Sequence, residues 1–435
     1  MLPPSSREMF DAGEALPPEE IARRQLRSLN RALRFAGNRL PFYQRIFAEA
    51  GFAPGPVRSF EEYARNVPSI RKADVAGAVR ATGSGRAGIE ALGTSRLSNV
   101  VMTSGTLGFN TFAFLTPSDL RGGSLLNSLR ELWVVGVRPG MKVLTLSPAW
   151  HALALLDTRG ITRLGAEVVI PWGTFAPRFV PNFLDAVAAH RPEHILLTAP
   201  VLRGMIEECD RRQLDVRRAF AGVRYIACAG ESLSAPYRRY ILERTGIEDI
   251  FERGGSSDGM FGGGECFAHR GHHISADLHY VEIVAPGTGE LLPPGRRGVA
   301  VVTNLLRGRS VYIRFNTEDV AAVIPGECPC GRTDPVIELY GRLTDSVIFE
   351  GRIVAPADVR GVLDQFPGLM GKPFQVERSG PEGIRIVMAA TPPGEDLTRA
   401  TEAVRAALGI DAAVTTGDSL ALGWKGQVMR GSRHG

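Results

Sequence analysis

Lysine is scarce in this chain of 435 residues, and cysteines and long apolar runs are scarce as well. Only four of the 51 basic residues are lysines (Lys72, Lys142, Lys372 and Lys425), so arginine carries nearly all of the positive charge. No run reaches the ~18 consecutive apolar residues of a membrane-spanning helix. The N-terminal stretch also lacks the basic and then apolar layout of a signal peptide. These absences predict a cytoplasmic protein with no membrane partner.

The five cysteines are too few for a disulfide framework in a chain of this length. The net charge is +5, but the basic residues are spread along the chain and no basic run is interleaved with aromatic residues. Nucleic acid is therefore not an expected partner. The content of 44% hydrophobic and 22% charged residues is typical of globular proteins, so the chain should fold on its own.

The length exceeds one ordinary core, because domains usually hold about 100 to 200 residues. A first helix is predicted to begin near residue 17, since apolar residues then recur at spacings of three and four. These residues are Leu26, Leu29, Leu33 and Ala36.

Short β-rich runs alternate with helical patterns in the middle of the chain. The β-rich runs are 143–146, 167–170, 195–198 and 223–227, and helical stretches follow at positions such as 183–189 and 237–244. This alternation predicts a mostly parallel, doubly wound sheet. Ser234 with Pro236 should begin the last of these helices, and Gly246 should end it.

Beyond residue 280 the pattern changes to antiparallel β, with Tyr280–Val284 and Val299–Thr303 on either side of a turn-rich stretch. After Gly341 a further set of β and α runs follows, at 346–349, 357–364, 384–389 and 397–408. The predicted fold is therefore α/β. We expect a large N-terminal domain (1–341) with mostly parallel, helix-flanked sheets and a β-rich subdomain, and a small α+β C-terminal domain (342–435).

A hydroxyl-rich loop with two glycines, TSGTLG at 103–108, lies between two β-like runs. Such loops present backbone N–H groups and hydroxyls to phosphate oxygens, because glycine permits a close approach of the backbone. An ordinary surface turn is the alternative interpretation for this segment alone.

Further motifs occur along the chain, among them CAGESLS from Cys228, RFNTED from Arg314, CPCGRT from Cys328 and YGRLTD from Tyr340. Together with LPFYQRIFAEAGF near the start and TSGTLG, they resemble the motifs of the adenylate-forming superfamily of acyl-CoA synthetases. The resemblance is closest to the phenylacetate-CoA ligase branch and covers nearly the whole chain.

The resemblance implies an AMP-forming ligase that uses ATP and Mg²⁺ to activate a small, aromatic carboxylic acid as acyl-AMP and then transfers the acyl group to coenzyme A. It also implies that the small C-terminal domain moves about a hinge near Asp345. Two alternatives remain open. The acyl acceptor could be an amine, a hydroxyl or a carrier-protein thiol, or the chain could be a non-catalytic relative that binds a nucleotide or an acyl ligand.

The same resemblance assigns candidate site residues. Asp319 matches a ribose-binding aspartate, Arg342 an arginine near the phosphates, and Lys425 a catalytic lysine close to the C-terminus. Further residues are also expected to contact the nucleotide. They are Thr103, Ser104, Gly105, Thr106, Gly108, Gly230 and Glu231. Alternative roles are open for both Asp319 and Lys425: Asp319 could cap a turn, and Lys425 could be a solvent-exposed lysine of the C-terminal tail. Arg314 could be purely structural.

Two positions in the segment 254–259 depart from the pattern of the branch. Gly254 stands where an aromatic residue usually lies against adenine, and Asp258 replaces the glutamate that holds magnesium. A carboxylate is still available for Mg²⁺, but it is shorter by one methylene. In the phosphate loop, Leu107, Phe109 and Asn110 also depart, which predicts weaker nucleotide contacts.

Four residues could form a closed tetrahedral site for structural Zn²⁺, namely Cys266, His273, Cys328 and Cys330. The segment CPCGRT and the spacing of Cys266 and His273 resemble zinc-bearing members of the branch. His269 and His272 are alternative ligands, and reduced, buried cysteines are the alternative to a metal site.

The acid pocket is predicted to include Trp150 and His151, which follow the strand at 143–146 and could stack on and hydrogen-bond to an aryl acid. A core aromatic residue and a loop histidine are the alternative roles. The sequence names neither the acid nor the acceptor, and it leaves the oligomeric state open, a homodimer included.

Overall fold

A computed structural model describes most of the chain. The described ranges are 8–83, 99–102, 112–146, 151–173, 177–256, 261–305, 311–349, 351–380, 383–389, 394–417 and 427–430. The chain divides into two compact units. The first comprises Met1–Val168, Arg253–Thr317 and Ala321–Glu338, and the second comprises Val169–Glu252, Glu318–Val320 and Leu339–Gly435. The fold is α/β, with a large mixed sheet, smaller sheets and flanking helices, which confirms the predicted class.

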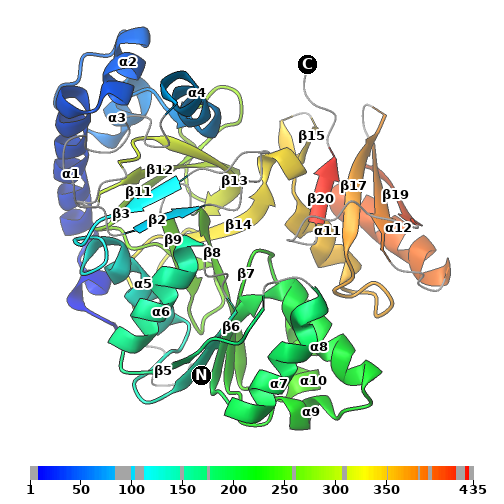
Figure 1. Ribbon diagram of the computed structural model, residues 1–435. Coiled ribbons are helices and arrows are strands. Elements are labelled where there is room, and N and C mark those ends of the chain that lie inside the picture. The colour runs from blue at the N-terminus through cyan, green and yellow to red at the C-terminus, as the bar shows by residue number, and fades with distance from the viewer. Residues whose placement is uncertain are drawn as a thin grey trace. The chain divides into compact units, whose positions relative to one another are not determined.

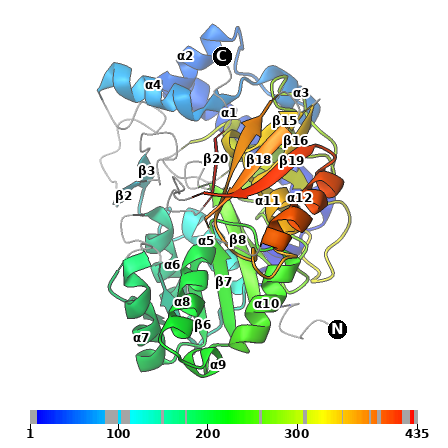
Figure 2. The ribbon, with the colours of Figure 1, turned by 90° about the vertical axis from the view of Figure 1, so that its right-hand side faces the viewer.

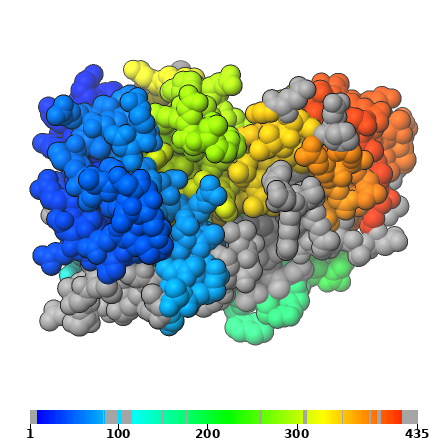
Figure 3. Space-filling model, turned by 90° about the horizontal axis from the view of Figure 1, so that it is seen from above, coloured from blue at the N-terminus to red at the C-terminus, as the bar shows by residue number. Residues whose placement is uncertain are grey.

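The helices of the first unit occupy its N-terminal part and the region after residue 122. They are α1 (Pro18–Arg39), α2 (Pro41–Glu49), α3 (Phe60–Asn66), α4 (Lys72–Thr82), α5 (Gly123–Val134) and α6 (Ala152–Arg163), preceded by the short 3-10 helix η2 (Ala12–Ala15). Helix α1 begins within one residue of the predicted position. Leu29, Leu33 and Ala36 lie buried on one of its faces, against a core that includes Tyr43 and Tyr63. Figure 3 shows the outer side of these N-terminal helices as a blue surface.

Short strands complete the first unit. They are β1 (Ile70–Arg71), β2 (Asn99–Met102), β3 (Phe112–Leu115), β4 (Lys142–Thr145), β9 (Phe261–Glu265), β10 (His272–His273), β11 (His279–Val284) and β12 (Gly298–Asn304). The predicted antiparallel pair is confirmed, because β11 pairs with β12 in a register that sets Tyr280 opposite Thr303. Strand β10 lies between two antiparallel neighbours, and His273 is paired with Gly264 on one side and Val336 on the other.

Four strands have residues in both units, namely β5 (Glu167–Val169), β8 (Asp249–Ser256), β13 (Phe315–Val323) and β14 (Val336–Arg342). Two strands lie wholly within the segment Val169–Glu252 of the second unit, β6 (His194–Thr198) and β7 (Tyr225–Ala229). They pair in parallel, as predicted. The helices of this part, green in Figure 1, are α7 (Val180–His190), α8 (Ala199–Arg211), α9 (Val216–Ala219) and α10 (Ala235–Thr245), with η3 at Pro177–Phe179. Ser234 caps α10 by accepting from the N–H of Tyr237 at 3.2 Å, and Gly246 ends it in the left-handed conformation (φ 74°).

The segment 342–435 lies entirely in the second unit. Its helices and a four-stranded sheet form a small α+β arrangement. Its elements are η4 (Leu343–Asp345), β15 (Val347–Phe349), β16 (Arg352–Val354), α11 (Pro356–Leu363), β17 (Phe374–Ser379), β18 (Gly383–Met388), α12 (Gly394–Leu408), β19 (Asp411–Thr416) and β20 (Gln427–Arg430). The sheet order is β19-β18-β17-β20, and Figure 2 shows α11 and α12 beside it. Leu363, Phe374 and Val404 join helices and sheet in one buried cluster, which agrees with the predicted elements of this segment.

Within the described ranges, no helix combines the length and the apolar character that crossing a membrane requires.

Candidate functional site

Two residues taken from separate sequence motifs are in contact in the second unit. Asp319 lies on β13 and Arg342 ends β14, and the Nε atom of Arg342 is 3.0 Å from Oδ1 of Asp319. Both side chains keep some exposure, 12% for Asp319 and 17% for Arg342. A charge-assisted contact of this kind fixes the orientation of the carboxylate, whose Oδ2 is buried.

The loop after β7 is hydrogen-bonded to the strand that carries Arg342, β14, and to β8. Gly230 has φ +95°, a conformation that side chains disfavour, and the chain turns there directly after the strand. The Ser232 hydroxyl then donates to the carbonyl of Leu339 at 3.1 Å, and the N–H of Leu233 donates to Glu252 at 2.8 Å. Because Leu339 precedes Arg342 on β14 and Glu252 lies on β8, the first bond holds the loop that carries Gly230 next to β14 and the second holds it next to β8. Sequence reasoning missed Ser232 and Glu252, although Ser232 belongs to the CAGESLS motif.

Arg314 serves the fold. Its guanidinium donates to Glu282 at 3.1 Å and to the carbonyls of Ala64 and Val67 at 2.6 Å each, so it ties α3 to the β-rich part of the first unit. These contacts favour the structural interpretation of this arginine. Arg314 and Glu318 both have positive φ (46° and 61°), so the backbone is strained at two positions of the RFNTED motif.

Several predicted site residues lie outside the described ranges. They are Thr103, Ser104, Gly105, Thr106 and Gly108 of the phosphate loop, together with Trp150, Asp258 and Lys425. His151 is described and belongs to the first unit. It caps α6, since its Nδ1 accepts from the N–H of Leu153 at 3.2 Å, and its side chain is half-buried.

The four predicted metal ligands converge in the first unit. One ligand atom from each of Cys266, His273, Cys328 and Cys330 lies within 4.8 Å of every other, and all four residues are buried. The sulfurs of Cys266 and Cys328 are 3.5 Å apart, and Sγ of Cys330 is 3.5 Å from Nε2 of His273. A tetrahedral zinc with Zn–S bonds of about 2.3 Å separates its ligands by roughly 3.8 Å. The cysteines are free thiols, and their spacing exceeds any S–S bond.

The neighbouring histidines contact other groups. His269 Nδ1 is 3.1 Å from the carboxylate of Glu265, and His272 Nδ1 is 3.1 Å from the carbonyl of Ile337. His273 is thus the histidine that the fold directs at the cysteines, because alternation along β10 sends the side chains of His272 and His273 to opposite faces.

The close contacts within the cluster shift the pKa values of His273 and Cys330. Burial disfavours the charged imidazolium of His273, but contacts with Cys328 and Cys330 outweigh burial and raise its pKa to about 9. Hydrogen bonds from Cys266 and Cys328 lower the pKa of the Cys330 thiol. The Arg332 guanidinium also hydrogen-bonds to Cys330, so two cationic side chains, His273 and Arg332, lie beside the sulfurs of the cluster.

A second buried charged group lies in the first unit. Arg253 forms a paired contact with Asp157 (2.8 and 3.0 Å) and donates to Glu131 at 2.9 Å. One cation here faces two carboxylates, and burial, helped by repulsion from Asp157, raises the pKa of Glu131 to about 7 in spite of Arg253.

The comparisons with known proteins agree with one another. Residues 75–305 match the family model described as AMP-binding enzyme. A phenylacetate-coenzyme A ligase of Thermus thermophilus is 30% identical over 360 residues, which is 81% of this chain and 77% of the relative. The phenylacetate-coenzyme A ligase of Escherichia coli is 26% identical and covers 83% of this chain and 80% of its own.

Solved structures give the same picture. A 2-hydroxyisobutyryl-CoA ligase in its postadenylation state, bound to an acyl-AMP, superposes with a TM-score of 0.84 at 25% identity and covers 100% of this chain and 94% of its own. An anthranilate CoA ligase bound to anthranoyl-AMP has a TM-score of 0.60 at 17% identity, with 76% of this chain and 65% of its own covered, and shows likeness of fold alone.

Proposed function

The chain belongs to the family of AMP-binding enzymes, on the phenylacetate-CoA ligase branch, and from this premise we propose that it is an AMP-forming acid–CoA ligase whose substrate is a small aromatic carboxylic acid. The observation that carries the proposal is the contact between Asp319 and Arg342, 3.0 Å apart, next to the loop that holds Gly230 and Glu231. The ligases that this chain resembles supply the chemistry: one acts on phenylacetate, and another is bound to an acyl-AMP.

The reaction has two balanced steps. A carboxylate oxygen of the acid attacks the α-phosphorus of ATP, which forms acyl-AMP and releases pyrophosphate. The thiolate sulfur of coenzyme A then attacks the acyl carbonyl, so that a thioester forms and AMP leaves with the electron pair of the broken C–O bond.

Asp319 would accept hydrogen bonds from both ribose hydroxyls, since an ionised carboxylate offers two oxygens as acceptors. Arg342 holds that carboxylate in place and brings positive charge to the nucleotide. Charge aimed at oxygens that become more negative in the transition state lowers the barrier. Gly230 and Glu231 would line the nucleotide from the loop after β7.

The remaining site residues belong to the proposal as expectations. Thr103 to Gly108 would bind phosphate oxygens through backbone N–H groups and hydroxyls. Asp258 would hold Mg²⁺, and Lys425 would stabilise the charge that develops between the acid and the α-phosphate. Trp150 and His151 would line the acid.

The proposed architecture has an N-terminal domain over 1–341 and a C-terminal cap over 342–435, with a hinge near Asp345. Such a cap would present Lys425 during adenylation and move aside for the acyl transfer. A cytoplasmic location is a further prediction of the sequence, which leaves the oligomeric state open, a homodimer included.

A structural zinc ion completes the proposal. Cys266, His273, Cys328 and Cys330 fit it because four buried soft donors converge on one point, without room for a substrate ligand. When bound, zinc would cross-link β10 to the loop before β14 and take no part in the reaction.

The test is pyrophosphate release from ATP and Mg²⁺ with a panel of aryl and alkyl acids, with and without coenzyme A. We expect acid-dependent release with aryl acids, and its loss in Lys425→Ala. Lys142→Ala is the matched control, because Lys142 is a half-exposed residue that faces Glu167 at 4.0 Å. Release that produces no acyl-CoA would favour an amine, hydroxyl or carrier-thiol acceptor, and absence of release with every acid would favour a non-catalytic binding protein.

A further inference from the structure

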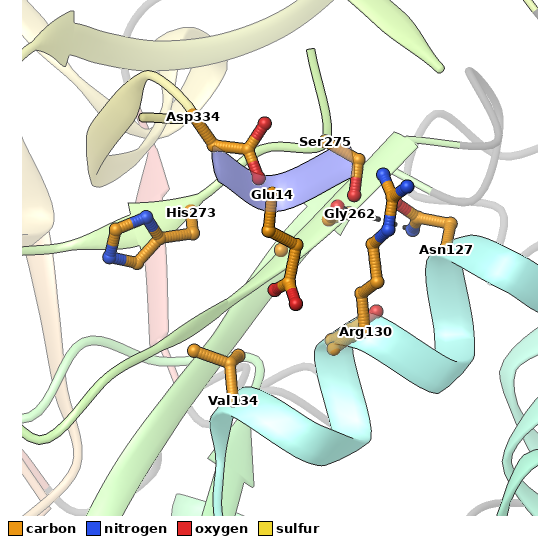
Figure 4. Close-up of a pocket in the computed structure, with 10 residues that line it drawn as sticks. Glu14, Asn127, Arg130, Val134, Gly262, His273, Ser275 and Asp334 are labelled. Atoms are coloured by element: carbon orange, nitrogen blue, oxygen red, sulfur yellow. Dashed lines mark hydrogen bonds between the residues drawn. The ribbon is translucent and has the colours of Figure 1, made fainter. Parts of the chain in front are cut away.

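A polar cavity adjoins the cysteine and histidine cluster in the first unit. Its empty volume is about 220 Å³, part of which is open to solvent. Figure 4 shows Asp334 and Glu14 between His273 on one side and Arg130 of α5 on the other. The polar side chains that line the cavity are Glu14, Asn127, Arg130, Glu131, His273, Ser275 and Asp334. The part of this space in which a water molecule can be centred is about 10 Å³, close to what one ordered water molecule needs.

His273 presents an unsatisfied atom to this region. Its Nε2 faces the sulfur of Cys330, whereas its Nδ1 is buried and has no hydrogen-bond partner among the described residues. The side chain of His273 is only 6% exposed and lines the cavity. If Nε2 holds a metal ion, the ring proton resides on Nδ1, which then needs an acceptor.

Most charged groups around the cavity are already engaged. Arg130 is held by Asp11 at 2.9 Å and by Asp277. Glu14 accepts from Arg332 at 2.7 Å through one oxygen and from the N–H of Phe10 through the other. Each carboxylate oxygen of Glu14 thus already accepts one hydrogen bond, and Arg130 offers donors only.

Asp334 differs from these groups. Its Oδ1 accepts from the N–H of Ala276 at 2.9 Å, and the described residues offer no donor to its Oδ2. Asp334 is 94% buried, and it follows Cys330 by four positions in the loop that carries two of the ligands. The buried Nδ1 of His273 and the carboxylate of Asp334 therefore line one cavity without a direct hydrogen bond between them. Water between such groups satisfies both.

We propose that water in this cavity accepts a hydrogen bond from Nδ1–H of His273 and donates to Asp334, which makes Asp334 a positioning residue for the metal-binding imidazole. The inference rests on the proposed zinc binding. The hydrogen-bonded carboxylate fixes the ring orientation and raises the basicity of Nε2, as partners of metal-binding histidines do in general.

The experiment compares Asp334→Asn with Asp277→Asn in the full-length protein. Asparagine keeps the acceptor for the Ala276 N–H but replaces Oδ2 by an N–H donor, so water can no longer donate there. We expect a rise of about 10- to 100-fold in the zinc dissociation constant, measured by competition with a chromogenic chelator. We also expect a shift of the ligand-field bands in the Co²⁺-substituted protein. Asp277 pairs with Arg130 and does not line the cavity, so Asp277→Asn should match the wild type in both measurements.

The outcomes separate the two proposals. A wild type that binds no zinc would overturn the metal site and this inference with it, and would leave the ligase activity untouched. A wild type that binds zinc, with Asp334→Asn equal to it in affinity and spectrum, would overturn this inference alone. If Asp334→Asn does not fold, a crystal structure of the wild type decides. Water within about 2.6–3.2 Å of both Nδ1 and an Asp334 oxygen supports the inference, and a dry cavity contradicts it.

Discussion

At the scale of single residues, the first unit depends on charges that are buried in groups. Arg253, Asp157 and Glu131 are each less than 10% exposed, and one guanidinium serves both carboxylates. A buried ion pair is expensive to break, because the partner that remains has no water to replace the lost contact. The two acids are not equivalent, since Asp157 makes the paired contact and Glu131 has the raised pKa.

We expect Asp157→Asn to lower the free energy of unfolding by about 3 kcal/mol or more, because it weakens the paired contact with Arg253. Urea unfolding at neutral pH measures this loss. A matched change in an exposed acid, Asp185→Asn, should cost less than about 1 kcal/mol, since Asp185 is 69% exposed in its pair with Arg212. Equal losses in the two variants would show that burial of the Arg253 pair is unimportant.

Glu131→Gln should change the pH dependence of stability. The folded state holds the proton of Glu131 up to a pKa of about 7, whereas the unfolded state releases it near 4.5, so the wild type loses stability as the pH rises between these values. Glutamine does not titrate. The stability advantage of the wild type over Glu131→Gln should therefore shrink from near pH 5 to near pH 7.5, by at most about 1.4 kcal/mol per pH unit. An advantage that stays constant or grows would contradict the raised pKa.

Asp319→Asn tests the proposed nucleotide site with little change of shape. Loss of a charged acceptor costs about 1.5–3 kcal/mol, so we expect kcat/KM for ATP to fall by roughly 10- to 100-fold. The pyrophosphate assay measures this effect, and Asp185→Asn again serves as the surface control. Unchanged kcat/KM for ATP would remove Asp319 from the ribose site and favour the turn-capping role.

At the scale of elements, the periodicity of apolar residues predicted most helices and strands correctly, including α1, the parallel pair β6 and β7, and the hairpin of β11 and β12. Boundaries with a chemical marker were predicted well, such as Ser234 and Gly246 at the two ends of α10. The two-residue strand β10 was not predicted, because it is too short to show a period and exists through its bonds to β9 and β14.

The packing of β9 depends on its glycines. A Cβ atom on Gly263 would lie 2.3 Å from the carbonyl oxygen of His273, a proposed zinc ligand on β10. We expect Gly263→Ala to lower stability by about 1–3 kcal/mol in a denaturant titration and to weaken zinc retention, since backbone atoms of β10 would have to shift. Gly77→Ala in α4 is the control. Its Cβ meets no atom within 4 Å, so alanine should stabilise the helix by about 0.5–1 kcal/mol. A neutral Gly263→Ala would refute the close approach.

At the scale of the whole molecule, the second unit joins chain segments that are far apart in the sequence. Ser234 donates to Asp364 at 2.6 Å, Arg203 donates to the carbonyl of Gly371 at 2.6 Å, and Lys372 pairs with Glu207 at 2.9 Å. Helices α8 and α10 are thus bonded to the segment around α11.

Ser234→Ala should lower stability by about 1–3 kcal/mol, because it removes both the cap of α10 and a donor to Asp364, which is fully buried. Amide hydrogen exchange in the α11 segment should also become faster. Lys372→Ala should cost less than about 1 kcal/mol, since that pair is half-exposed. Protection of α11 that is unaffected by Ser234→Ala would mean that this segment is held without α10.

The sequence by itself determined the fold class, the order of most elements, the family and the three cysteines of the candidate metal cluster, because these depend on local periodicity and on short motifs whose chemistry is intrinsic to their residues. Tertiary structure alone decided which histidine joins Cys330, that Arg342 meets Asp319, and that Asp334 lines a cavity with His273. Those contacts join residues brought together by strand register and sheet order. Both arise from many cooperative backbone bonds that no local pattern encodes.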